Sequence, residues 1–179
     1  MKKLKLEELG RISAADYKDS EKIPVCLVLD NLRSLHNVGS AFRTADAFTV
    51  EKIVLTGITG VPPHREIHKT ALGATESVPW QHIESPRGAV TALRGEGYQV
   101  ILIEQTTLSV PLHNFEWNKN EKYALVFGNE VNGISDEVLD VAHHAIEVPQ
   151  AGSKHSLNVS VCIGVVVWEC FRQLRLKQD

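Results

Sequence analysis

The sequence has no excess of positive charge. Its 179 residues include 19 lysines and arginines against 22 aspartates and glutamates, which gives a formal net charge of −3. Proteins that coat nucleic acid through bulk electrostatics have the opposite balance, because they neutralise the phosphate backbone. Any nucleic-acid partner of this chain must therefore meet a local cluster of basic side chains.

Cysteines and long apolar runs are scarce as well. Cys26, Cys162 and Cys170 form no closely spaced pair, which favours reduced, buried thiols over disulfides or a metal site. The longest apolar run, Val159–Trp168, has about half of the ~20 residues that a membrane span needs. The lysine-rich start lacks the apolar stretch of a secretory signal. We therefore expect a soluble, cytoplasmic protein without a membrane partner.

The short motifs of the common nucleotide-binding and hydrolytic domains are also missing. No G-x-G-x-x-G follows a predicted strand, and there is no P-loop and no G-x-S-x-G turn. The eight histidines lack the H-E-x-x-H spacing, and His143 and His144, placed on a helix, would point apart. Zinc is therefore not expected.

What is present is an alternation of short apolar runs with amphipathic segments. Strands are predicted at Val25–Leu29, Lys52–Leu55, Tyr98–Ile103, Tyr123–Phe127 and Ala145–Val148. Helices are predicted at Asn37–Phe48, His64–Leu72, Arg87–Arg94, after an N-cap at Ser135, and at Leu157–Leu174. This alternation predicts an α/β fold, a single domain with a mostly parallel sheet flanked by helices. Residues 1–22, with an amphipathic helix within 2–19, are expected to be a short N-terminal helical extension of a domain at 23–179.

Polar segments follow several of the predicted strands. In parallel α/β sheets ligands bind beyond the carboxyl ends of the strands, so these segments form the candidate site. They are residues 30–45, 127–135 and 148–160. Taken singly, each has an ordinary explanation as a capped helix, a turn or an N-cap. The first places Asn37 and Ser40 on one polar face of its helix, with Arg43 able to reach across the helix mouth.

In this order, the three segments resemble the TrmH (SpoU) family of the SPOUT RNA methyltransferases. The family pattern N-x-G-x-x-x-R-T-A matches Asn37–Ala45, and F-G-x-E-x-x-G-I matches Phe127–Ile134. The pattern I-P-x-x-G-x-x-x-S-L-N-V-S-V matches Val148–Val161, and its last six residues are nearly diagnostic. The departures are small: Gln150 stands in place of methionine, and Val131 and Thr49 stand in place of glycine.

The resemblance implies a C-terminal segment that passes through a loop to form a trefoil knot. It implies S-adenosylmethionine as cofactor, RNA as substrate, and a homodimer with the active site near the subunit boundary. The implied reaction is methyl transfer to a ribose 2′-hydroxyl of tRNA or rRNA. Two alternatives stay open: a catalytically silent RNA- or cofactor-binding module of the same fold, and a structural domain that binds S-adenosylmethionine no better than ATP.

The resemblance also assigns site residues. The catalytic set is Arg43, Asn37, Glu130, Ser156 and Asn158. The cofactor set is Gln105, Thr106, Gly128, Val148 and Leu157. Arg43 is the family's proposed base, but a guanidinium hardly loses its proton, so a role in binding phosphate is equally open. His36 and Glu130 are the nearby groups that titrate in a useful range.

Basic side chains near these segments are candidates for gripping the RNA. They are Arg33, His64, Arg65, Lys69 and Lys154, together with His68 and the N-terminal lysines. Solvated surface charge explains them equally well. The sequence contains no segment that resembles the extra N-terminal RNA-binding domain of some relatives, so it leaves the mode of RNA binding open.

Overall fold

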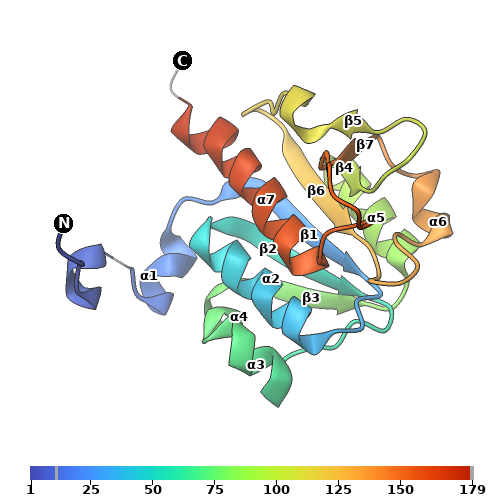
Figure 1. The fold of residues 1–179 in the computed structure, drawn as a ribbon. Helices are drawn as coiled ribbons and strands as arrows, with labels where there is room; N and C mark the ends of the chain where they lie inside the picture. The colour runs from blue at the N-terminus through green and yellow to red at the C-terminus, as the bar shows by residue number, and fades with distance from the viewer. Residues whose placement is uncertain (11, 178–179) are drawn as a thin grey trace.

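Seven parallel strands form one sheet in the order β3-β2-β1-β6-β4-β7-β5 in the computed structural model, which describes residues 1–10 and 12–177 (Figure 1). The strands are β1 Ile23–Asp30, β2 Val50–Thr56, β3 Trp80–Ile83, β4 Tyr98–Ile103, β5 Val110–Pro111, β6 Lys122–Phe127 and β7 His144–Glu147. Strand β1 lies beside β6, the chain crosses from the edge strand β3 to β4 on the other side of β1, and β7 inserts between β4 and β5. The predicted parallel sheet is confirmed.

Helices cover both faces of this sheet (Figure 1). On one face lie α2 Leu35–Ala47, α3 Arg65–Ala71, α4 Ala74–Ser77 and α7 Val159–Phe171, and on the other α5 Pro86–Gly95 and α6 Asp136–Leu139. Side chains alternate along β1, so that Leu27 and Leu29 join the apolar cluster under α2 and α7, whereas Cys26 and Val28 join the cluster under α5. The domain is therefore a three-layer α/β unit. No helix of the described residues is long and apolar enough to cross a membrane.

The chain ends have shorter elements than the sequence predicts. In place of one helix within residues 2–19 there are a 3₁₀ turn η1 at Leu6–Leu9, a left-handed Gly10 and helix α1 at Ala14–Asp19. Residues 11, 178 and 179 lie outside the described part. The last helix starts only at Val159 and ends in a π turn η3 at Arg172–Leu176. A further 3₁₀ turn, η2, covers Leu112–Asn114.

Three interior predictions need correction. The edge strands β3 and β5 and the helix α4 were not predicted, because they are two to four residues long and have no apolar run. His143 lies in a bend and His144 begins β7, so neither is helical. Ser135 stands at the N-cap position of α6 but makes no capping hydrogen bond, because its hydroxyl bonds to Asp30. The division of the chain at residues 22 and 23 stays a prediction.

The close approach of α2 and α3 depends on Gly39. A Cβ atom there would lie 2.1 Å from Thr70 Oγ1 and 2.3 Å from the Ile67 carbonyl oxygen. We expect Gly39→Ala to lower the free energy of unfolding by about 3 kcal/mol, because the backbones would have to separate. Urea denaturation measures this. Gly95→Ala is the control, since its Cβ would meet no atom within 4 Å; equal stability of the two variants would contradict the packing argument.

Candidate active site

A buried carboxylate marks the carboxyl end of β1. Asp30 has no exposed surface, and it accepts hydrogen bonds from the Ser135 backbone N–H at 2.7 Å and the Ser135 hydroxyl at 2.9 Å. The amide nitrogen of Asn31 donates to the same carboxylate at 2.8 Å. Because a buried carboxylate without donors is strongly unfavourable, these bonds hold the loop after β6 against the end of β1. No local pattern predicts this contact, because Asp30 and Ser135 lie 105 positions apart in the chain.

The same loop presents Glu130 to the start of α2. Its carboxylate accepts from the backbone N–H groups of Arg33 at 2.9 Å and Ser34 at 3.1 Å. It also accepts from the Asn37 amide nitrogen at 2.9 Å. Glu130 thereby fixes the rotamer of Asn37 and satisfies backbone donors that lead into the helix.

Asn37 continues this chain of hydrogen bonds to the third polar segment. Asn158 donates from its amide nitrogen to Asn37 Oδ1 at 3.3 Å. The side-chain Oδ1 of Asn158 caps α7 by accepting from the backbone N–H groups of Ser160 at 2.9 Å and Val161 at 3.4 Å. Asn37 is 8% exposed and Asn158 is exposed, so the link runs from the interior of the domain to its surface. The structure brings three of the five predicted catalytic residues, Glu130, Asn37 and Asn158, into one network.

A cavity of about 570 Å³ opens beside this network. It lies at the carboxyl ends of β4, β6 and β7, and Glu130, Ser156 and Asn158 line it. Of the predicted cofactor residues, Gln105, Gly128, Val148 and Leu157 also line it. Thr106 does not; its carbonyl oxygen accepts from the Ser109 hydroxyl in the loop outside.

The walls of the cavity combine apolar side chains with polar groups. Ile103, Phe127 and Ile146 provide the apolar floor at the strand ends. Glu104 and Glu147 supply carboxylates that were not among the predicted site residues. Glu104 directly follows the apolar strand β4, and Glu147 is the last residue of β7. Gln105 donates to the His155 carbonyl oxygen at 3.0 Å. This contact ties the loop after β4 to the segment before α7. A flat apolar floor with polar groups at its rim suits a ligand that has both a ring system and charged ends.

Arg43 lies away from the cavity. It is exposed on the outer face of α2, and within the described residues its guanidinium has no hydrogen-bond or ion-pair partner. His36, seven residues earlier, shares this outer face because seven residues make almost two full helical turns. Arg43 therefore does not line the cavity of its own chain, and its catalytic role stays a prediction.

The environment of Glu130 makes its carboxylate a weak proton acceptor. Partial burial alone would raise its pKa, but the hydrogen bonds from Arg33, Asn37 and Ser34 outweigh this and lower the pKa below its ordinary value of 4.5. His36 is bonded to Glu66 on α3, with 2.9 Å between Nε2 and Oε2. Glu130 and His36, the two groups that the sequence suggested as alternative bases, are thus both engaged in hydrogen bonds.

This lowered pKa predicts how stability depends on pH. The Glu130 carboxylate stabilises the fold above its unfolded pKa, and this contribution disappears as the pH falls through the lower folded pKa. We expect Glu130→Gln to be less stable than the wild type in urea at neutral pH, and the gap to close in acid below the folded pKa. A gap of equal size at both pH values would show that the carboxylate charge is not what holds the loop.

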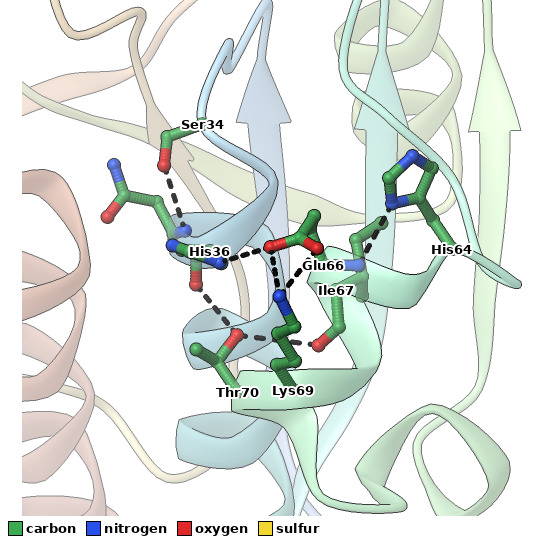
Figure 2. A network of polar contacts seen from close by, with 8 residues as sticks. Ser34, His36, His64, Glu66, Ile67, Lys69 and Thr70 are labelled. Carbon is green, nitrogen blue, oxygen red and sulfur yellow. Dashed lines mark hydrogen bonds and ion pairs between the residues drawn. The ribbon is translucent and has the colours of Figure 1, made fainter.

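The predicted RNA-binding residues fall into two groups. The side chains of Arg33 and Lys154 are exposed on segments that border the cavity. His64, Arg65 and Lys69 belong to α3 or its N-cap, on the other side of α2. Figure 2 shows Lys69 and His36 converging on Glu66, and the Lys69 ammonium lies 2.7 Å from the Glu66 carboxylate. The charge of Lys69 is therefore largely neutralised within the chain.

A parallel sheet with a polar cavity at its carboxyl edge defines a cofactor-binding α/β domain. Comparison with known families makes the class specific. Residues 24–168 match the model of the SpoU rRNA Methylase family, and the chain belongs to this family.

Individual relatives agree with this assignment. A Staphylococcus aureus protein assigned to the TrmH family of tRNA/rRNA methyltransferases is 31% identical over 156 residues, which are 87% of this chain and 62% of that protein. The 23S rRNA (guanosine-2'-O-)-methyltransferase RlmB of Vibrio cholerae is 32% identical over 167 residues, 93% of this chain and 66% of that protein. The structure of an AdoMet-bound rRNA methyltransferase from Sinorhizobium meliloti superposes with a TM-score of 0.79 at 27% identity, over 88% of this chain and 60% of that one. The chain therefore spans less than two thirds of these relatives.

Proposed function

We propose that the chain is an S-adenosylmethionine-dependent methyltransferase that acts on a ribose 2′-hydroxyl of tRNA or rRNA. The observation that carries this proposal is the hydrogen-bonded link Glu130–Asn37–Asn158 at the edge of the 570 Å³ cavity. The names of the relatives point to RNA methyl transfer, and RlmB to the 2′-oxygen.

The cavity fits S-adenosylmethionine. The strand-end side chains Ile103 and Phe127 offer an apolar surface to an adenine ring, and Gly128 lets the backbone of Gly133 and Ile134 pack closely in the loop that lines the cavity. Glu104 and Glu147 add negative charge to the lining, which would favour the cationic sulfonium and amino group of the cofactor. When bound, the cofactor supplies an electrophilic methyl group.

The residues of the chain then have to orient the ribose and stabilise its oxygen as it loses a proton. Asn158 and Ser156 line the cavity and can hold the ribose, and Glu130 keeps Asn37 and Asn158 in place. Arg43 keeps its charge, so we assign it to the phosphate beside the ribose and to the forming alkoxide. The proton leaves to a phosphate oxygen or to water.

Arg43 can do this only from a second copy of the chain. On α7, Leu157, Val161, Val165 and Trp168 follow each other at helical spacing just before and along the helix, and each is at least 37% exposed. We infer that two copies pair through this apolar stripe and the adjoining outer face of α2, as the family resemblance implies. The partner's Arg43 would then complete the cavity of each copy. Sizing chromatography should give a dimer, and Val165→Glu a monomer; a monomeric wild type would refute this arrangement.

We also infer that the segment between β7 and α7 forms the trefoil knot. Two contacts support it: residues 155–159 line the cavity together with the loops after β4 and β6, and Gln105 bonds to His155. The chain then returns to pack α7 on α2.

The test is methyl incorporation from labelled S-adenosylmethionine into total tRNA and into rRNA. Label in one RNA class, resistant to alkaline cleavage at the modified linkage, would establish the 2′-O reaction and name the substrate class. Calorimetric titration with S-adenosylmethionine and with ATP accompanies it. Cofactor binding without label in any RNA would favour a silent module, and equal binding of ATP would refute the cofactor assignment.

A further inference from the structure

A second cavity lies on the α2 side of the sheet, near its free edge. It has a volume of about 480 Å³ and opens between the segment that leads into α3 and the start of β3. Its wall includes Pro62, Pro63, Trp80 and the side chains of the first turn of α3. The proposed methyl-transfer site lies elsewhere, at the ends of β4, β6 and β7.

An aromatic ring forms one wall of this cavity. Trp80 is 36% exposed and meets Phe42 in an edge-on contact, with ring centroids 6.4 Å apart and planes at 86°. The contact fixes the indole, while more than a third of the residue stays accessible. A fixed, accessible indole is a platform on which a nucleobase can stack.

Charged side chains surround the ring, and they are not used within the chain. Arg65, His68 and Glu76 line the cavity, and among residues 1–10 and 12–177 their side chains have no hydrogen-bond or ion-pair partner. Their neighbours Glu66 and Lys69, by contrast, are paired with each other (Figure 2). The cavity thus combines a free guanidinium and a free imidazole with a free carboxylate.

His64 adds a donor of defined position. Its Nδ1 accepts a hydrogen bond from the Glu66 backbone N–H at 3.1 Å, so a neutral His64 carries its proton on Nε2. Figure 2 shows this ring at the start of α3, on the side away from the Glu66–Lys69 pair. The Nε2–H group remains available to an acceptor such as a phosphate oxygen.

We propose that this cavity binds an unpaired nucleotide of the RNA substrate, with the base stacked on Trp80. Arg65, His64 and His68 would face its phosphate and ribose, and Glu76 would accept from an amino or imino group of the base. This assignment rests on the proposed function and narrows it to RNA whose target region is looped or single-stranded, because stacked bases in a helix cannot enter the cavity. This cavity beside β3 and the methyl-transfer site at the ends of β6, β4 and β7 are three to five strand spacings apart, about 14 to 24 Å.

The test measures binding of a labelled single-stranded hexanucleotide and of the same strand in a duplex, by fluorescence anisotropy with the full chain. Trp80→Ala should weaken single-strand binding about tenfold, the order expected from loss of one base–aromatic stack, and Trp80→Phe should restore most of it. Arg65→Ala should weaken binding and reduce its salt dependence. Ile58→Ala, an exposed apolar truncation outside the cavity, and Arg94→Ala on the opposite face of the sheet should bind like the wild type.

Thermal unfolding and S-adenosylmethionine binding, measured on every variant, separate the possible failures. Wild-type affinity of folded Trp80→Ala for the single strand would overturn the assignment, as would an equal loss for duplex and single strand. Absence of cofactor binding and of methyl transfer in the wild type would instead refute the proposed function. In that case the binding of the single-stranded hexanucleotide to wild type and Trp80→Ala would still test whether a base stacks on Trp80.

Discussion

Replacing Arg43 with alanine should reduce methyl incorporation into RNA by about a hundredfold to a thousandfold, the loss typical of removing one donor to a developing oxyanion. Affinity for S-adenosylmethionine should not change, because the proposed partners of Arg43 are the phosphate and the forming alkoxide of the RNA and not the cofactor. The two quantities are measured by incorporation of labelled methyl groups and by calorimetry. Arg94→Ala, an equal change of charge on α5, should keep full activity.

The dimeric origin of Arg43 can be tested with the same variant. Arg43→Ala and Asn158→Ala should each be inactive alone. Mixed dimers contain one cavity with an intact Asn158 and an intact Arg43 from the partner, so mixing the variants should restore a substantial part of the activity. No recovery after confirmed subunit exchange would place Arg43 in the same site as its own Asn158, against the arrangement inferred from the exposed stripe of α7.

Gly128→Ala should lower the affinity for S-adenosylmethionine by about a hundredfold, or about 2.7 kcal/mol. A Cβ atom at Gly128 would lie 2.2 Å from the Gly133 carbonyl carbon and 2.3 Å from the Ile134 nitrogen. Both are backbone atoms, so the loop that lines the cavity would have to open. The paired hydrogen bonds between Asn129 and Gly133, at 2.8 and 2.9 Å, would then be lost.

Gly95→Ala is the matched control, because the added methyl group there meets nothing and lies at the end of α5. It should bind the cofactor like the wild type. Thermal unfolding distinguishes a local opening of the loop from global unfolding. A Gly128→Ala variant with unchanged affinity would mean that the cofactor does not depend on the shape of this loop.

The sequence allowed the central sheet and the meeting of the polar segments to be predicted. The strands β1, β4 and β6 are continuous apolar runs, and their side chains are buried on both faces, which is why the pattern identified them. Because parallel strands end at one edge, the segments containing Asn37, Glu130 and Asn158 had to lie close together. The structure places them in one hydrogen-bonded network.

Other features depend on contacts that no local pattern encodes. The edge strands β3 and β5 are too short and too exposed to leave a periodic signal. The hydrogen bonds from Ser135 to Asp30 join residues 105 positions apart. The Ser135 hydroxyl, which was predicted to cap the following helix, donates instead to the end of β1. For Arg43, helical spacing predicts which face of α2 carries the side chain. It does not predict what packs against that face, which we propose is a second copy of the chain.

The insertion of β7 between β4 and β5 limits how the protein can be made on the ribosome. In the described sheet the edge strand β5 is hydrogen-bonded only to β7, although β5 is synthesised before β7. The segment after β7 supplies both a wall of the cavity and the helix that covers β1. A nascent chain that lacks α7 therefore exposes apolar strand surface and has no complete binding site. The sheet edge and the cavity can form only once α7 has been made, which predicts slow folding with apolar surface exposed in the meantime.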